Sequence, residues 1–368
     1  MTKNLVPAIL RTLLMEEKYE PIPQPATGAS AAPHQRRPRY RGKNPRRFED
    51  KYKERVGDAA TLAKVLAAGK TPAGTHRPMM VAEILAVLSP KAGDVAVDST
   101  LGYGGHAREI LAKILPGGCL VGLDADPVEL PKTEARLRAL GFDATVFSAH
   151  RANFAGLPQL LAAQNLAGAD LVLADLGLSS MQIDDPGRGF SVKFNGPLDL
   201  RMNPYRGQPA SAMLQKIQPD ALAQILLDFS DEPHAALLAP ALAGKSFSFT
   251  LQLAGTIRDT LPRLKREDAD LTVRRVFQAL RIAVNDELSA LESFLRNLPR
   301  CLKPGGRVAI LTFHSGEDRR VKKSFEANFG GGIYSDIARE VVRPSPSELH
   351  ANPRSAPAKL RWAIRAPG

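Results

Sequence analysis

Three short apolar runs that each end in aspartate constrain the fold of this chain most strongly. They lie at residues 94–98 (DVAVD), 119–124 (CLVGLD) and 170–175 (DLVLAD). Helical patterns at residues 106–115 and 127–140 separate the first two runs from each other and from the third. Continuous apolar strands spaced by helices predict a parallel sheet that is covered by helices on both faces.

A second set of elements extends this pattern. We expect a weaker strand, a helix and two late strands, at residues 145–148, 158–164, 307–313 and 360–365. After Asp175 the alternation stops for about a hundred residues, and that stretch is helical in character. We therefore predict a Rossmann-like α/β domain formed by residues 76–185 and 292–368, with an inserted helical domain at residues 186–291.

Positive charge is concentrated in the first fifth of the chain. Residues 1–75 hold 15 Lys and Arg against 7 Asp and Glu, a net charge of +8 out of +12 for the whole chain. We predict that they form a disordered basic arm that binds a polyanion. Tyr40, Phe48 and Tyr52 lie among its basic residues, so guanidinium groups would bind phosphates while rings stack on unpaired bases. A solubilising tail is the main alternative, and an organelle transit peptide is a minor one.

The rest of the composition argues against several other classes. Uninterrupted apolar stretches are too short for a membrane span, and residues 1–20 do not resemble a secretory signal. Cys119 and Cys301 lie in apolar contexts, so we interpret them as buried thiols in a reducing compartment, without a disulfide framework or a metal site. We expect a cytoplasmic protein with no membrane partner.

A glycine-rich loop follows the first strand. Asp98 ends that strand, and the segment 101–106 (LGYGGH) turns into the next helix. Glycines let a ligand approach the backbone, and free amides at the helix start offer hydrogen bonds. Asp124 ends the second strand, where a carboxylate can accept hydrogen bonds from both ribose hydroxyls. Gly102, Gly104 and Ala107 also satisfy a dinucleotide fingerprint, and a tight turn without any ligand would explain the same pattern.

Three further features favour S-adenosylmethionine over a dinucleotide. Asp98 precedes the glycines, where a carboxylate can hold the ammonium group of the cofactor. Asp175 closes the fourth strand and is followed by LGLSS (176–180), which places polar groups beside the reacting centre. The turn LKPGGR (302–307) resembles the corresponding turn of class I methyltransferases. We therefore predict a class I methyltransferase fold.

From residue 76 to the end, the chain resembles the bacterial 16S rRNA (cytosine-N4) methyltransferase family, the RsmH or MraW type. The motifs that carry the resemblance are, in chain order, HRPMMV (76–81), VDSTLGYGGH (97–106), GLDADP (122–127), NFAGL (153–157), DLGLSS (175–180), QIDDP (182–186), RGF (188–190), GPLDLRM (196–202), FQALRIAVNDEL (277–288), FHS (313–315), EDR (317–319) and AKLR (358–361). The basic arm lies outside the resemblance. Tyr103, Met181 and Gly316 depart from the residues usual in the family.

The resemblance implies an activity, a cofactor and partners. The activity is N4-methylation of a cytidine in 16S rRNA at the P-site or decoding region, with S-adenosylmethionine as the methyl donor and 16S rRNA or the small ribosomal subunit as the partner. It also implies cofactor contacts at Gly104, Gly105, His106, Asp124, Phe154, Asp175 and Gln182. A homodimer is an arrangement that the sequence leaves open.

Candidate catalytic residues follow from the chemistry of an amine nucleophile. The lone pair of an exocyclic amine is delocalised into its ring, so an acceptor for its N–H and a group that takes the proton would promote attack. We assign this role to Asp175, with His314 and Ser315 as second candidates. An equally weighted alternative is that Asp175 only orients the cofactor and takes no part in proton transfer.

The inserted helical domain is the predicted substrate-recognition domain. Arg188, Lys193, Arg201 and Arg281 are our candidates for phosphate contacts. The alternative is structural, since Arg201 could simply pair with Asp199. Three rival functions remain: a dinucleotide-dependent dehydrogenase, a class I RNA methyltransferase with a different target, and a non-catalytic rRNA-binding assembly factor.

Overall fold

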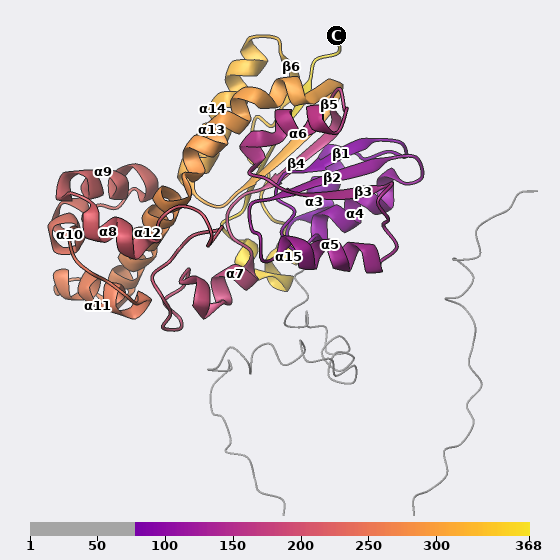
Figure 1. The fold of residues 1–368 in the computed structure, drawn as a ribbon. Coiled ribbons are helices and arrows are strands. Elements are labelled where there is room, and N and C mark those ends of the chain that lie inside the picture. Colours follow the sequence, from indigo (N-terminus) through magenta and orange to yellow (C-terminus); the bar gives the residue numbers. More distant parts are fainter. Residues whose placement is uncertain (1–77) are drawn as a thin grey trace, which may run out of the picture. The chain divides into compact units, whose positions relative to one another are not determined.

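The computed structural model describes residues 78–368 and builds them around one seven-stranded sheet (Figure 1). Its order is β3-β2-β1-β4-β5-β7-β6, and β1 to β5 run parallel to one another. Strand β7 pairs antiparallel with both β5 and β6. The strands are β1 (Val95–Asp98), β2 (Cys119–Asp124), β3 (Phe147–Arg151), β4 (Ala169–Asp175), β5 (Leu302–Thr312), β6 (Tyr334–Ile337) and β7 (Lys359–Arg365). The predictions for the basic arm at residues 1–75 lie outside the described residues.

Helices cover both faces of the sheet, which confirms the predicted α/β class. Successive strand residues alternate between faces, so Ala96 and Leu171 join one buried cluster while Val97 and Val172 join the other. The first cluster packs under α3 (Val81–Leu88), α4 (Gly105–Ile114) and α5 (Leu130–Ala139). The second packs under α6 (Leu157–Ala163), α13 (Glu287–Cys301) and α14 (Ser315–Gly330). Burial on both faces explains why the strands are apolar throughout.

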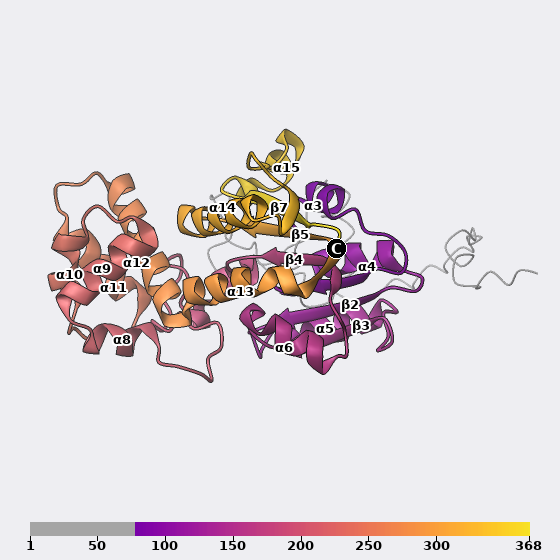
Figure 2. The same ribbon diagram turned by 90° about the horizontal axis from the view of Figure 1, so that it is seen from above.

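Between β4 and α13 the chain leaves the sheet and forms a separate helical cluster with its own apolar core. Its helices are α8 (Ala210–Lys216), α9 (Pro219–Ser230), α10 (Ala235–Leu242), α11 (Thr250–Thr260) and α12 (Arg266–Asn285). Figures 1 and 2 both show this cluster gathered to one side of the sheet. Helix α12 leads through Asp286, whose φ is +52°, directly into α13, which returns to the sheet. We refer to residues 186–291 as the helical insert.

The observed elements differ from the sequence pattern in a few places. Strand β6 was not predicted, because only Tyr334 and Ile337 of its four residues face the core. Strand β3 begins at Phe147, later than expected, and α5 begins at Leu130 rather than at Pro127. Within residues 78–368, none of the helices combines the length and the apolar character that a membrane crossing requires.

Short elements complete the described part of the chain. They are η3 (Phe154–Gly156), α7 (Ser180–Asp184), η4 (Pro186–Arg188), α15 (Pro346–Ala351) and η5 (Pro353–Ser355). The first of them follows β3 and leads into α6, whereas α7 and η4 follow β4 where the chain enters the helical insert. They therefore lie at the edge where a ligand is expected to bind in an open parallel sheet.

Candidate cofactor and substrate site

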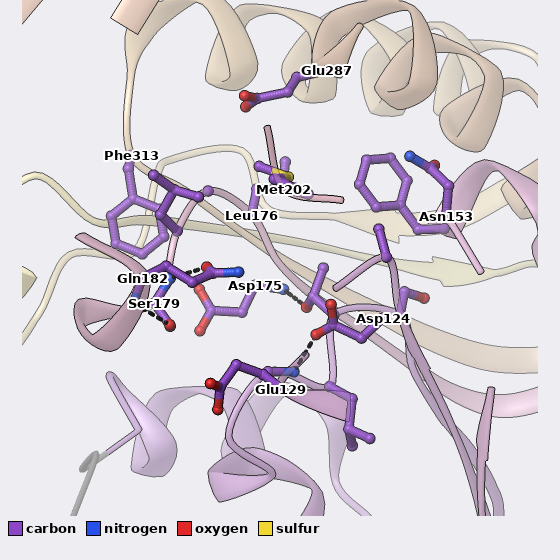
Figure 3. Close-up of a pocket in the computed structure, with 18 of the residues that line it drawn as sticks. Asp124, Glu129, Asn153, Asp175, Leu176, Ser179, Gln182, Met202, Glu287 and Phe313 are labelled. Atoms are coloured by element: carbon purple, nitrogen blue, oxygen red, sulfur yellow. Dashed lines mark hydrogen bonds between the residues drawn. The ribbon is translucent and has the colours of Figure 1, made fainter. Parts of the chain in front are cut away.

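A cavity lies at the carboxyl ends of β1, β2 and β4, where the strand order reverses (Figure 3). Loops after these strands line one side of it, and residues of the helical insert and of α13 line the other. Asp124 and Asp175 both line it, as the sequence predicted for a ligand at this edge. The site therefore has an end formed by the sheet and an end formed by Met202, Asn285 and Glu287.

The glycine loop shapes the sheet end of the cavity. Gly102 and Gly104 have φ values of +48° and +78°, which other residues rarely adopt. A Cβ at Gly104 would lie 2.9 Å from Cγ2 of Thr133 on α5, so this glycine permits close packing against that helix. Gly102 and Gly105 line the cavity, whereas Gly104 does not.

Asp124 is held by backbone amides on both of its carboxylate oxygens. The amide of Gly102 donates to Oδ2 at 2.7 Å, and the amide of Asp126 donates to Oδ1 at 2.8 Å. Burial raises the pKa of Asp124, although both amides act in the opposite direction. The arrangement fixes the carboxylate and leaves its other lone pairs for ligand hydroxyls, as a ribose diol requires.

Glu129 is a candidate ligand that sequence reasoning missed. It lies at the N-cap of α5 and lines the same cavity (Figure 3). Its Oε1 accepts a hydrogen bond from Nζ of Lys132 at 2.8 Å. Its Oε2 is buried and has no hydrogen-bond partner among the described residues. Only its position five residues after Asp124 could have indicated it.

Asp98 requires a correction. We expected its carboxylate to hold the ammonium group of the cofactor, but the side chain is only 1% exposed and does not line the cavity. Its Oδ1 instead accepts a hydrogen bond from the amide of Thr100 at 3.1 Å. Burial raises the pKa of Asp98 to about 6, with the nearby His106 acting to lower it. The carboxylate is therefore enclosed by the protein and is not part of the cavity surface.

Asp175 presents its carboxyl group to the middle of the cavity. Its backbone amide donates to Oγ1 of Thr100 at 2.6 Å. The carboxyl group has no hydrogen bond from any residue between 78 and 368, and Oδ2 lies 3.6 Å from Nδ1 of His106. Burial, assisted by the negative charge of Glu317, raises the pKa of Asp175 to about 7. A carboxyl group of this kind can accept a hydrogen bond and take up a proton near neutral pH.

Two residues implied by the family resemblance also line the cavity. Phe154 packs edge-on against Phe294, with ring centroids 5.4 Å apart, and offers an apolar face. The amide of Gln182 links two loops, because Nε2 donates to Oδ2 of Asp126 at 2.8 Å and Oε1 accepts from the amide of Ser179 at 3.0 Å. Gln182 therefore fixes the wall of the cavity as well as lining it.

His314 and Ser315 lie outside the cavity lining. Nδ1 of His314 accepts from the amide of Glu317 at 3.3 Å and caps α14. The hydroxyl of Ser315 donates to Oδ2 of Asp231 in the helical insert at 2.9 Å. Since both side chains have structural partners and neither faces the ligand space, we withdraw them as proton acceptors. Their neighbours Phe313 and Glu317 line the cavity instead.

The predicted phosphate contacts divide into two groups. Arg188 binds Oδ2 of Asp126 at 2.9 Å, Arg201 pairs with both oxygens of Asp199, and Arg281 pairs with both oxygens of Glu287. These guanidinium groups neutralise carboxylates of the protein, so we no longer count them as phosphate ligands. Lys193 is exposed, with Nζ 5.5 Å from the centroid of the Phe194 ring. Of the four candidates, it alone lacks an ion pair among the described residues.

The cavity fits S-adenosylmethionine in its donor set. Asp124 suits the ribose hydroxyls and Phe154 offers an apolar face to the adenine. Oγ of Ser99 and Oε2 of Glu129 are buried side-chain atoms of cavity residues that lack partners among residues 78–368. Asp175 and Glu317 also line the cavity, neither has an ion pair with a Lys or Arg among the described residues, and acidic groups there favour a cationic ligand.

The strand order and this cavity define a class of protein. A sheet with the antiparallel β7 between β5 and β6, and a ligand site at the carboxyl ends of β1, β2 and β4, is that of a class I methyltransferase. The methyl donor of this class is S-adenosylmethionine.

Comparison with known proteins identifies the family. Residues 73–366 match the profile of the MraW methylase family. The chain is 47% identical over 344 residues to ribosomal RNA small subunit methyltransferase H 1 of Lachnoclostridium phytofermentans, covering 90% of this chain and 93% of that protein. It is also 47% identical over 343 residues to ribosomal RNA small subunit methyltransferase H 2 of Alkaliphilus metalliredigens, covering 90% and 98%. The chain belongs to the MraW methylase family.

These alignments correct one expectation about the basic arm. Residues 76–368 are 293 of the 368 residues, or about 80% of the chain, whereas the two alignments cover 90% of it. Part of the arm must therefore align with these relatives. The resemblance reaches further toward the N-terminus than the motifs alone indicated.

Proposed function

We propose that this chain transfers a methyl group from S-adenosylmethionine to the N4 amine of a cytidine in 16S rRNA, in the P-site or decoding region. The names of the relatives support small-subunit rRNA as the substrate. The motifs that the chain shares with the cytosine-N4 methyltransferase family support the amine as the target. Such a substrate would place the enzyme in the cytoplasm.

One observation carries the proposal. The carboxyl group of Asp175 lines the cavity at the end of β4 without a hydrogen bond from the described residues, and its pKa is raised to about 7. An exocyclic amine needs an acceptor for its N–H while it attacks, and a base for the proton that it then loses. A cytidine amine that enters between Asp175 and the helical insert would meet such a group.

We assign the cofactor contacts to the sheet end of the cavity. When bound, S-adenosylmethionine supplies an electrophilic methyl group on a cationic sulfur. Asp124 would bind the ribose, Phe154 would pack on the adenine, and the loop at Gly102 and Gly105 would bring backbone close to the ligand. His106 and Gln182 are the remaining proposed cofactor contacts. Gly104 would act indirectly, because its close contact with α5 holds the glycine loop in place.

The helical insert is the proposed substrate-recognition domain. Met202, Asn285 and Glu287 bring it to the cavity, on the side opposite Asp124. The side chain of Asn285 fixes the loop that carries Met202, because Oδ1 accepts from the amide of Met202 at 2.7 Å and Nδ2 donates to the carbonyl of Leu200 at 2.7 Å. The target base must be unpaired or flipped to reach this space. Lys193 and the basic arm would then bind the RNA backbone.

Two assays test the proposal. Calorimetry should detect binding of S-adenosylhomocysteine and none of NAD, and NAD binding alone would favour a dehydrogenase. The purified protein and labelled S-adenosylmethionine should then methylate undermethylated small subunits, with the label in N4-methylcytidine after nucleoside digestion. Label in another nucleoside would indicate a different RNA target. Cofactor binding without transfer to any ribosomal particle would support an assembly factor.

A further inference from the structure

A buried imidazole lies between a backbone carbonyl and the candidate catalytic carboxyl group. The ring of His106 lies near the start of α4 and is 7% exposed. Its Nε2 lies 2.9 Å from the carbonyl oxygen of Met79, and its Nδ1 lies 3.6 Å from Oδ2 of Asp175. Each of the two ring nitrogens thus faces one oxygen of the protein.

The Met79 carbonyl determines the tautomer of the ring. A carbonyl oxygen can only accept a hydrogen bond, so Nε2 carries the hydrogen in this contact. In the neutral ring, Nδ1 then has a lone pair that points toward Asp175. Burial lowers the pKa of His106, which favours the neutral form, although the Met79 carbonyl and the nearby Asp98, Glu109 and Glu348 oppose this shift.

Within residues 78–368, the side-chain acceptor recorded beside the Asp175 carboxyl group is Nδ1 of His106. This carboxyl group has no hydrogen bond among the described residues, and Thr100 engages only the backbone amide of Asp175. Two other acidic groups face this region, Glu317 from α14 and Asp98 from β1. Glu317 disfavours an anionic Asp175, and Asp175 acts in the same way on Asp98. The lone pair on Nδ1 of His106 is therefore the partner that a protonated Asp175 would find.

We propose that His106 is a positioning residue that holds Asp175 ready to receive the proton lost by the target amine. The proposal rests on the proposed methylation of an exocyclic amine. The target nitrogen would form a bond to the methyl carbon while the carbon–sulfur bond of the donor breaks and its electron pair stays on sulfur. The nitrogen also loses one hydrogen as a proton, and the electron pair of that N–H bond stays on nitrogen. The proton forms an O–H bond on Asp175, and that hydroxyl donates to Nδ1 of His106. The 3.6 Å separation would shorten as the hydrogen bond forms.

Nitrogen NMR of the full chain tests the proposed tautomer of His106 beside Asp175 and needs neither RNA nor cofactor. The protein is labelled with ¹⁵N-histidine, and the His106 resonances are assigned by their loss in His106→Asn. Nδ1 should show the shift of an unprotonated nitrogen and Nε2 that of an N–H at about pH 7.5, where an unperturbed histidine is also neutral. A hydrogen on Nδ1, or an imidazolium at this pH, would overturn the proposal.

The pH dependence of methyl transfer tests the role. Deprotonated Asp175 is the active form, so the rate of wild type should rise with pH through about 7. His106→Asn removes the acceptor that stabilises the protonated acid. The midpoint should therefore fall by about one pH unit, and the plateau rate should fall about tenfold or more. Lys113→Gln, at an exposed position on the same helix and outside the cavity lining, is the matched control and should leave both unchanged.

The possible outcomes separate this proposal from the proposed function. An unchanged midpoint with a lower plateau would mean a merely structural His106, and an upward shift would mean that it acts as a cation. Either result overturns the proposal while methylation itself stands. Should His106→Asn fail to fold, Asp175→Asn provides the second test, because it should shift the Nδ1 resonance of an intact His106. If the wild-type protein methylates no cytidine, the proposed function is refuted. The NMR result would still decide whether His106 and Asp175 are arranged as proposed.

Discussion

The sheet edge and the helical insert both carry charged residues that the sequence marked as functional, but the structure uses them differently. At the sheet edge, Asp124 and Asp175 reach a common cavity because parallel strands end side by side. In the insert, Arg201 pairs with Asp199 two residues away, and Arg281 pairs with Glu287 six residues away. The sheet topology determines where a carboxylate at a strand end lies. The partner of a guanidinium group depends instead on which carboxylate packs beside it in the folded chain.

The largest expected effect belongs to the sheet edge. Asp175→Asn removes the base from the cavity but keeps the size of the side chain. Methyl transfer should fall by about 10²–10³-fold, while binding of S-adenosylhomocysteine changes only a few-fold. Single-turnover assays and calorimetry measure these two quantities. Asp259→Asn, at an exposed position on α11, should leave both unchanged. Undiminished transfer in Asp175→Asn would remove Asp175 from the mechanism.

The ion pair of Arg281 gives the next largest effect, and it tests stability. Arg281→Gln leaves the carboxylate of Glu287 partly buried without its partner, which should cost about 3–5 kcal/mol in the free energy of unfolding. Urea denaturation measures it. Lys193→Gln, at an exposed position, should cost less than about 0.5 kcal/mol. Weaker RNA binding with unchanged stability in Arg281→Gln would restore its interpretation as a phosphate ligand.

Asp98 should make the chain less stable at higher pH. Its pKa of about 6 lies above the ordinary 3.8, so the folded state keeps the proton after the unfolded state has lost it. Stability therefore falls as the pH rises between these two values, and the full cost of about 3 kcal/mol is present above pH 6.

Asp98→Asn removes this cost. The variant should be more stable than wild type at about pH 8 and nearly equal to it at about pH 4. Thermal unfolding at the two pH values checks the sign. Since Asp98 lies behind the cavity wall, its substitution should change cofactor affinity little. A large loss of affinity would instead support its earlier assignment to the cofactor ammonium group.

Alanine substitutions at one glycine of the sheet edge and one of the helical insert compare backbone packing in these two regions. Gly104 at the sheet edge and Gly207 in the insert have φ values of +78° and +73°, but a Cβ would meet Thr133 at 2.9 Å only at Gly104. Both Gly→Ala variants carry the same backbone strain from a positive φ. The additional loss in the free energy of unfolding at Gly104, caused by the clash with Thr133, should therefore be about 1–2 kcal/mol. Parallel denaturation curves measure the difference. Equal costs would mean that contact with α5 does not require Gly104.

The smallest effect concerns RNA. Lys193→Gln should weaken binding to small-subunit rRNA only a few-fold, and the slope of log affinity against log salt should decrease by about one. Filter binding at several salt concentrations measures this slope. Lys216→Gln provides an exposed control on α8. An unchanged slope for Lys193→Gln would leave the insert without a tested phosphate contact.

Local patterns explain why the fold was more predictable than the site. Strand β2 was predicted with its observed bounds, because an apolar run bounded by a glycine turn and a terminal Asp124 is a local signal. Strand β6 has no such signal, since its two middle residues are exposed and its pairing with β7 is remote in sequence.

The direction of a side chain depends on contacts that no motif records. Asp98 and Asp175 both end strands, but only Asp175 lines the cavity, whereas Asp98 is buried and accepts a hydrogen bond from the amide of Thr100. His314 is adjacent to the cavity residue Phe313, but it turns away to cap α14. Glu129 had no motif of its own, only its position five residues after Asp124. Sequence reasoning therefore located the edge of the sheet that carries the cavity, but it could not give the directions in which Asp98 and His314 point.

The most direct test of the central claim is mass-spectrometric mapping of methylated nucleosides in 16S rRNA. The rRNA is taken from cells that carry the wild-type gene, no copy of it, or the Asp175→Asn variant. N4-methylcytidine at one position in the wild type, and its absence in the other two, is the predicted result. An identical methylation map in all three would contradict the account.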